Sequence, residues 1–285
     1  MAVKRLLAVV VAVALITGAV VIRRFIDDGG ELSLGGASST IYCDSALADA
    51  CRSVFDAADL KVEAPGVTLD RFLDDTDDGP VVWIAADLWF DILASEQQRV
   101  RASAEVTSTS GPIVHSPLVI LGDVCAPAAW SCFLDLDRST DAGLDALDTS
   151  AGVAAYTQIA AVKLGTQTFA TNDFDLAFNE WRRNLDANTT FSPARVPVLD
   201  IYLTRRGTYD LIATTQAQAN QLGRSAELPT DAGPELEVGA VALNGARLPG
   251  ALDDLASALV ADGWTDGAAP DAERPSGGAM QALRS

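Results

Sequence analysis

Apolar and polar positions alternate along most of this chain in a pattern typical of an α/β protein. The continuous apolar runs VVWIAA (81–86) and EVGAVAL (237–243) are typical of buried strands. Helical patterns follow such runs, as in DLWFDILASEQQRVRA (87–102) and in the Ala-rich stretch 148–165, which Gly165 is expected to close. Strands that alternate with helices predict an α/β fold with parallel sheets and helices on both faces.

The N-terminal residues differ in composition from the rest of the chain. Residues 6–22 are apolar or small and lie between the basic pairs Lys4-Arg5 and Arg23-Arg24. As a helix this run would measure roughly 25 Å, near the lower limit for crossing a bilayer. No small-x-small cleavage site or lipoprotein cysteine follows it, so we expect a single-pass signal anchor over 1–26. Residues after about 26 would then be extracellular or periplasmic. The alternative is a cleaved signal and secretion.

Four cysteines support the export reading. They fall as two local pairs, Cys43 with Cys51 and Cys125 with Cys132, and neither pair has the C-x-x-C spacing of a zinc or redox site. An even count behind an export-type segment predicts the disulfides Cys43–Cys51 and Cys125–Cys132. The alternative is four buried free thiols in a cytosolic protein.

Composition removes several functional classes. The 285 residues carry 20 Lys+Arg against 39 Asp+Glu, a formal charge of −19, and residues 25–285 alone carry −23. Such a chain is not a general nucleic-acid binder, because it has too few bases to neutralise phosphates. The single histidine, His115, disfavours histidine-based metal sites and Ser-His-Asp chemistry. No nucleophile elbow, Walker loop or zincin motif is present. We therefore expect no catalytic residues, no metal and no cofactor.

Five segments, in order, resemble landmarks of one family. They are TIYCDSALADA (40–50), PVVWIAADLWFDIL (80–93), HSPLVILG (115–122), DTSAGVAAY (148–156) and TYDLIATTQAQAN (208–220). Together they resemble the type II periplasmic substrate-binding protein fold, in the membrane-anchored form of actinobacterial type. The resemblance implies a two-lobed α/β fold with a cleft between the lobes. Lobe 1 would comprise 38–115 plus 216–267 and lobe 2 would comprise 116–215, with a polar linker over 27–37 and a disordered tail over 268–285.

The resemblance also nominates residues that would face the cleft. Ends of strands and starts of helices converge there, and helix-start N–H groups can hold a polar or anionic ligand without lysine. The candidate ligand-binding residues are Asp44, Ser45, Asp87, Trp89, Thr149, Ser150, Ala151, Gly152, Thr214 and Thr215. The alternative is that the Asp, Ser and Thr residues only cap helices and that Trp89 packs in the core. Ser116 and Pro117 are the candidate hinge.

The implied function is binding rather than catalysis. The two lobes would close around a small polar or anionic solute, and delivery to an ABC permease or another membrane protein is the expected use. The membrane itself would be contacted through the N-terminal helix, and no nucleic acid is expected as a partner. The alternative is an extracellular scaffold or sensor-like domain that keeps the two lobes without transporting.

Overall fold

The computed structural model describes residues 39–285 apart from isolated positions. The positions left out within that range are 75, 77, 78, 101, 137, 138, 194, 195, 206, 225, 227, 232, 271 and 272. The expected signal anchor and the whole of the expected linker lie outside the described residues. In the part of the chain that the structure describes, no helix has the length and apolar character needed to cross a membrane.

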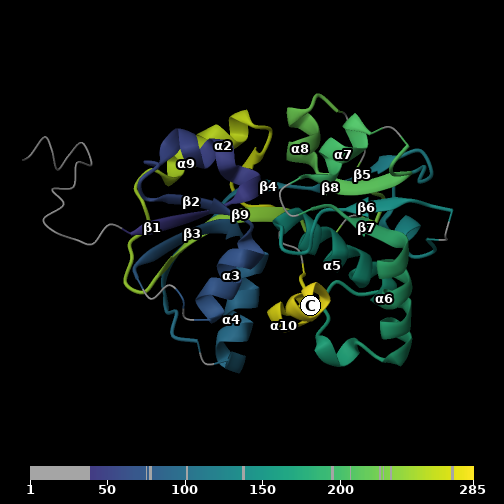
Figure 1. Ribbon diagram of the computed structural model, residues 1–285, viewed down its shortest axis with the longest axis horizontal. Coiled ribbons are helices and arrows are strands. Elements are labelled where there is room, and N and C mark those ends of the chain that lie inside the picture. The colour runs from purple at the N-terminus through teal and green to yellow at the C-terminus, as the bar shows by residue number, and fades with distance from the viewer. Residues whose placement is uncertain are drawn as a thin grey trace, which may run out of the picture. The chain divides into compact units, whose positions relative to one another are not determined.

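Six strands form the larger sheet, in the order β10-β4-β9-β3-β1-β2 (Figure 1). Their bounds are β1 Thr40–Asp44, β2 Leu60–Glu63, β3 Val81–Ala86, β4 Val106–Ser116, β9 Leu236–Leu243 and β10 Thr265–Asp266. β1 pairs in parallel with β2 and β3, whereas β9 is antiparallel to β3 and β4, and β10 is antiparallel to β4. The parallel pairing that the sequence predicted is therefore present in only part of this sheet, which is mixed.

Four strands form the second sheet, in the order β5-β8-β6-β7. Their bounds are β5 Leu118–Gly122, β6 Ala142–Leu144, β7 Thr189–Phe191 and β8 Leu211–Thr215. β6 is parallel to β7 and β8, and β5 is antiparallel to β8. The antiparallel pairs have a topological cause. β4 leaves the first sheet beside the point where β9 enters it, with Ser116 opposite Leu236, and β5 enters the second sheet where β8 ends, with Leu118 opposite Thr215.

Helices cover both faces of each sheet (Figure 1). The larger sheet has α2 and α9 on one face and α3 and α4 on the other, and the smaller sheet has α7 and α8 on one face and α5 and α6 on the other. Their bounds are α2 Ala48–Val54, α3 Pro65–Leu73, α4 Leu88–Val100, α5 Ser150–Leu164, α6 Leu176–Asn188, α7 Val198–Thr204, α8 Gln216–Gln221 and α9 Leu252–Ala261. The larger sheet with its helices is the first lobe, and the smaller sheet with its helices is the second.

The crossing from the first sheet to the second lies against the start of α8. Pro117 joins β4 to β5, and the backbone N–H of Gln216 donates to its carbonyl oxygen at 2.8 Å. The Oγ of Ser116 accepts a hydrogen bond from the backbone N–H of Ala217 at 3.0 Å. The chain thus changes sheet at the predicted hinge residues, and the hinge motion itself, like the exact lobe boundaries, stays a prediction.

Each lobe has its own aromatic core. In the first lobe, Phe72 packs edge-on against both Tyr42 and Trp83, with ring centroids 5.8 and 5.3 Å apart. In the second lobe, Trp130 stacks on Phe133 at 6.1 Å beside α5. α5 is almost entirely buried, and it ends at Gly165 in the left-handed conformation, as the sequence predicted. The cleft therefore lies between two lobes that each have a hydrophobic core.

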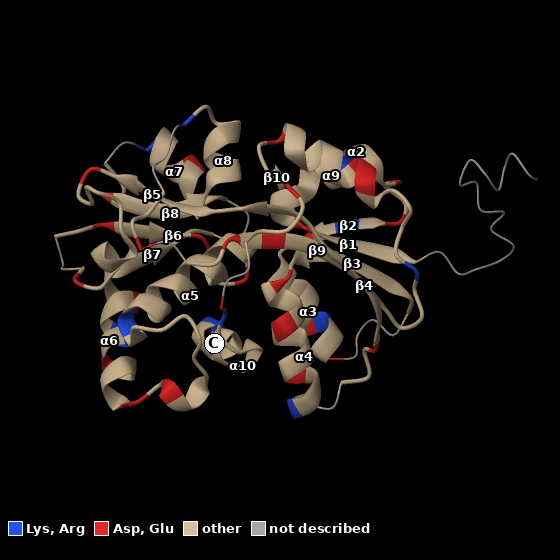
Figure 2. Cartoon of the chain, turned by 180° about the vertical axis from the view of Figure 1, so that it is seen from behind, with Lys and Arg blue, Asp and Glu red and all other residues tan. Residues whose placement is uncertain are grey.

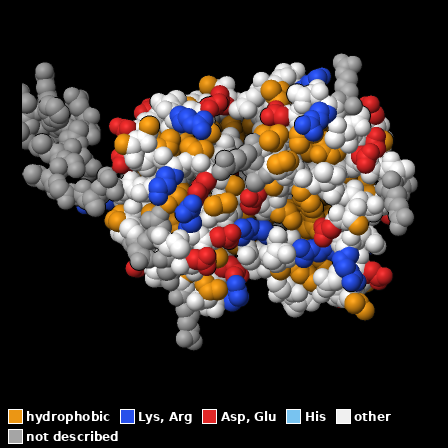
Figure 3. Space-filling model, viewed as in Figure 1, with side chains coloured by type: hydrophobic (Ala, Val, Ile, Leu, Met, Phe, Trp, Pro, Cys, Tyr) orange, Lys and Arg blue, Asp and Glu red, His pale blue; other side chains and the backbone are white. Residues whose placement is uncertain are grey.

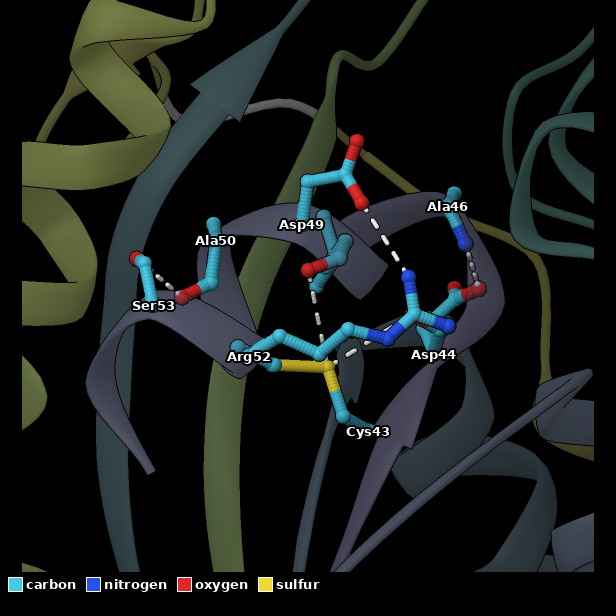
Figure 4. The surroundings of a disulfide bond; sticks show 9 residues. Cys43, Asp44, Ala46, Asp49, Ala50, Arg52 and Ser53 are labelled. Atoms are coloured by element: carbon cyan, nitrogen blue, oxygen red, sulfur yellow. Dashed lines mark hydrogen bonds and ion pairs between the residues drawn. A yellow bond between two sulfur atoms is a disulfide. The ribbon is translucent and has the colours of Figure 1, made fainter. Parts of the chain in front are cut away.

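Both predicted disulfides are confirmed. Cys43–Cys51 ties the end of β1 to α2, and Cys125–Cys132 closes the loop after β5. Figure 4 shows the first disulfide with Asp44 beside it, at the mouth of the turn that follows β1. The bond therefore fixes the backbone on which two candidate ligand residues sit.

The prediction of a disordered tail over 268–285 is wrong for its last part. Residues Gly277–Arg284 form a helix, α10, which Ser276 caps and which lies between α4 and α5 (Figure 1). Met280 packs into the core of the first lobe, whereas Ala279 and Leu283 pack into that of the second. The Pro/Gly-rich residues before this helix suggested disorder. The helix is stable because both lobes bury its apolar face.

Ion pairs and backbone contacts fasten the C-terminal segment to both lobes. Arg284 makes a bidentate pair with Asp70 of α3, with distances of 2.9 and 2.8 Å. From the second lobe, Arg182 donates to the carbonyl oxygens of Ala282 and Leu283 at 2.8 and 2.9 Å. Figure 3 shows basic and acidic side chains next to one another across the middle of this face.

Candidate functional site

A cleft of about 520 Å³ lies between the lobes, where strand ends from both sheets meet. Its first-lobe wall follows β1 and β2, and its second-lobe wall follows β6, β7 and the start of α5. The lining residues of opposite lobes include Ser45, Ala46, Glu63 and Ala64 on one side and Asp145, Asp148, Thr149, Ala151, Ser192 and Pro197 on the other. In open α/β sheets, ligands bind in the crevice beyond the carboxyl ends of parallel strands, which is the position of this cleft.

Three of the predicted ligand residues line this cleft. Ser45 follows β1 and is half-buried, while Thr149 and Ala151 belong to the start of α5. The Thr149 hydroxyl accepts a hydrogen bond from the backbone N–H of Gly152 at 3.2 Å, so it also caps the helix. The capping and cleft-lining roles coexist at this residue.

Three other predicted residues bind one another across the lobes. Ser150 of the second lobe donates its hydroxyl hydrogen to Asp44 of the first. The indole N–H of Trp89, also of the first lobe, donates to the Ser150 Oγ at 3.0 Å. The exposed fractions of Asp44, Ser150 and Trp89 are 2%, 2% and 0%, so water does not compete for these bonds. We call this arrangement the latch.

The latch sets the electrostatic state of Asp44. Burial raises the pKa of its carboxyl above the ordinary value, while the hydroxyl of Ser150 and the backbone N–H of Ala46 act in the opposite direction. Figure 4 shows the Ala46 bond, which closes the turn after β1. Ser150 therefore stabilises the ionised form of Asp44 while it joins the lobes.

The lobes also touch directly at the backbone. The N–H of Gly66, at the start of α3, donates to the carbonyl oxygen of Asp148 at 2.9 Å. A Cβ atom on Gly66 would lie 2.8 Å from the Cα of Asp148, closer than non-bonded carbons pack. Glycine at this position therefore permits the approach of the two walls.

Asp145, which follows β6, is a cleft residue that sequence reasoning missed. Its Oδ1 accepts hydrogen bonds from the backbone N–H of Val198 at 2.7 Å and from the Ser192 hydroxyl at 3.3 Å. Burial raises the pKa of Asp145 to about 6, and these two donors offset part of that rise. The carboxylate thus lies at the start of α7, where the helix N-terminus favours negative charge.

Two arginines line the first-lobe wall, each beside an acid. Arg71 donates to Glu63 at 3.0 Å, and Glu63 also accepts from the hydroxyl of Thr68 at 3.0 Å. Arg52 pairs with Asp49 at 3.1 Å (Figure 4). Neither the arginines nor Glu63 was singled out from the sequence. Arg52 lies within α2, Arg71 lies within α3 and Glu63 is the last residue of β2, so no local pattern marked them as cleft residues.

The remaining four predicted ligand residues, like the three of the latch, lie outside this cleft. Asp87 forms an ion pair with Arg274 from the segment before α10, and burial raises its pKa to about 6 against the opposing effect of Arg274. Gly152 lets α5 approach the preceding turn, since a Cβ there would lie 2.1 Å from the Ala146 carbonyl oxygen.

Thr214 and Thr215 serve the start of α8. Thr215 caps this helix by accepting from the N–H of Gln218 at 3.1 Å, and Thr214 donates to the Gln218 side chain at 2.6 Å. The contacts of Thr214 and Thr215 therefore match the alternative that these residues only serve a helix start. Their partner Gln218 does line the cleft.

Acidic residues are spread over helices and loops of both lobes (Figure 2). Within the cleft they are concentrated on the second-lobe wall, at Asp145 and Asp148, with buried Asp44 close behind the start of α5. The site thus combines carboxylates, hydroxyls, an amide, two arginines paired with acids and small apolar side chains, a set suited to binding a polar solute.

Comparison with solved structures identifies the architecture. A periplasmic thiamin binding protein is similar, with a TM-score of 0.54 at 13% sequence identity over 86% of this chain and 92% of that one. The chain has the two-lobed fold of the periplasmic substrate-binding proteins. This type II binding-protein fold is what the five sequence landmarks led us to expect.

Two further solved structures are similar with lower TM-scores. The periplasmic binding protein AfuA from Actinobacillus pleuropneumoniae has a TM-score of 0.49 at 13% identity, over 79% of this chain and 78% of its own. An ABC transporter structure from Clostridium perfringens has a TM-score of 0.47 at 10% identity, with coverage of 78% and 80%. No protein-family model matches the sequence. No curated protein matches it either.

Proposed function

We propose that this chain is a membrane-tethered extracellular solute-binding protein whose lobes close on a small polar solute. One observation carries the proposal: a cleft of about 520 Å³ lies where strand ends of both lobes converge. Its volume is in the range usual for small-molecule sites. Hydroxyls of Ser45, Thr149 and Ser192 and the carboxylate of Asp145 supply fixed polar groups on its walls.

The sequence supports the location. The apolar run 6–22 between basic pairs suits an anchor, and the two disulfides suit an oxidising compartment. Delivery of the solute to an ABC permease is the use that fits a tethered receptor of this fold.

A thermal-melting panel tests the proposal. The purified full-length chain is melted with amines, amino acids, sugars and oxyanions, each at millimolar concentration. A solute present at 100 times its Kd stabilises the protein by about 2.7 kcal/mol, a rise in Tm of roughly 5–11 °C for a chain of this size. Solution scattering with the same solute should show a more compact particle. A panel in which no class of solute shifts Tm would overturn the proposal.

A second candidate function has an observation of its own. The latch and α10 already hold the lobes in contact in this structure. Such fastening favours a scaffold or sensor-like domain whose lobes stay together. Unchanged scattering with a bound solute would select this second candidate over the closing receptor.

A further inference from the structure

Two carboxylate oxygens beside the cleft have no hydrogen-bond donor. The Oδ2 of Asp145 and the Oδ1 of Asp148 are buried, and no residue that the structure describes donates to either one. Asp145 as a whole is only 4% exposed. Its other oxygen, Oδ1, accepts hydrogen bonds from Val198 and Ser192. Both residues lie on the second-lobe wall of the cleft.

The missing partner must be a donor. An ionised carboxylate only accepts hydrogen bonds, and burying it without a partner is costly. A hydroxyl would satisfy the hydrogen bond and leave the negative charge uncompensated. An ammonium or guanidinium group satisfies both, and its hydrogen bonds to a carboxylate are about twice as strong as neutral ones.

Other positive features of the cleft are already engaged. Arg71 pairs with Glu63 and Arg52 with Asp49, each within 3.1 Å. The positive end of the α5 dipole faces Asp44, which accepts from Ser150, the first residue of that helix. The start of α5 would by itself attract an anion. The neighbouring carboxylates would repel it.

The remaining wall defines the rest of the solute. Apolar surface comes from aliphatic or proline side chains such as Val62, Val67 and Pro193, and none of the described lining residues is aromatic. Such a surface accommodates methylene groups and offers no ring for stacking.

We propose that the cleft binds a small aliphatic organic cation, with its ammonium or guanidinium group held by Asp145 and Asp148. This inference rests on the solute-binding function proposed above. The sequence led us to expect a polar or anionic solute. We now favour a cation over an anion, because the unpartnered groups at the site are hydrogen-bond acceptors.

Titration calorimetry with defined probes tests the inference. The full-length chain is titrated with putrescine, agmatine and spermidine, and separately with phosphate, molybdate and glucose. At least one amine should bind, and Asp145→Asn should weaken that binding by roughly 30-fold or more, the usual effect of removing one member of a buried charge pair. Asp148→Asn, at the half-buried neighbour, should weaken it less and serves as a second variant should Asp145→Asn fold poorly.

A matched control separates site from overall charge. Asp254→Asn removes the same charge from an exposed position on α9 and should leave amine binding unchanged. Amine binding that survives both cleft substitutions would overturn the inference. So would binding of phosphate, molybdate or glucose without any amine, which leaves the solute-binding function intact. Absence of binding by every probe would count against both.

Discussion

The latch makes a quantitative prediction about Ser150. Replacing Ser150 with Ala removes one donor to Asp44 and one acceptor for the Trp89 N–H, and all three side chains are buried. A buried polar group left without its partner costs about 1–3 kcal/mol, so the two groups together give about 2–6 kcal/mol. We expect the lower half of that range, because separation of the lobes would let water reach both groups.

The expected result is a lower melting temperature that depends on pH. A loss of about 2–4 kcal/mol corresponds to a fall in Tm of roughly 4–16 °C for a body of this size. Ser150 counteracts the burial that raises the pKa of Asp44, so its removal raises that pKa further. The resulting penalty is present when Asp44 is ionised and disappears as pH falls and the carboxyl is protonated. The fall in Tm should therefore be larger at neutral pH than in mild acid.

Scanning fluorimetry of the full-length chain, with hydrogen exchange at β1 and the start of α5, provides the assay. Ser53→Ala is the matched control, because it removes a hydroxyl that only donates to the Ala50 carbonyl oxygen within α2 (Figure 4). Equal melting of Ser150→Ala and Ser53→Ala at both pH values would refute the latch. A fall in Tm that does not shrink in acid would refute the role assigned to Asp44.

Two further predictions concern Asp145 and α10. In the ligand-free chain, Asp145→Asn should become more stable relative to wild type as pH rises from about 4 to 7. Because the pKa of Asp145 is raised to about 6 in the folded protein, ionisation of this carboxyl costs wild type up to roughly 3 kcal/mol of folding stability over that interval. Urea melts at several pH values measure this, and parallel curves for the two proteins would show that the carboxyl titrates normally. Arg284→Ala should speed hydrogen exchange throughout α10 and lower stability by about 1–2 kcal/mol, because the largely buried guanidinium loses a bidentate pair with the half-exposed Asp70 and a bond to the Gly66 carbonyl oxygen. Arg52→Ala, which breaks an exposed pair, should cost less than about 1 kcal/mol, and equal effects of the two variants would show that α10 needs no such fastening.

The sequence predicted much of the fold because several signals are local. Continuous apolar runs marked β3 and β9, and the spacing of Cys43 with Cys51 and of Cys125 with Cys132 indicated both disulfides. Strand ends and helix starts pointed to Ser45, Thr149 and Ala151 as cleft residues. These features depend on neighbours within about ten residues, so the pattern along the chain carries them.

Short elements were harder to predict. β6 and β7 contain three residues each, too few to show a two-residue periodicity, so Asp145 and Ser192 at their ends gave no sign that they line a site. α10 has eight residues and would not be stable alone in water; its formation depends on the cores of both lobes.

By itself the sequence indicated the longer strands and helices and both disulfides, and the resemblance of five segments to a known family indicated the two-lobed fold. Only the tertiary structure decided what the polar residues do. Asp44, Trp89 and Ser150 were predicted to contact a ligand, yet they contact one another, and the Ser150–Asp44 bond joins positions 106 residues apart. No local pattern specifies such a partner, because packing of the two lobes determines which buried polar groups are satisfied within the chain. The same packing leaves the oxygens of Asp145 and Asp148 without a donor.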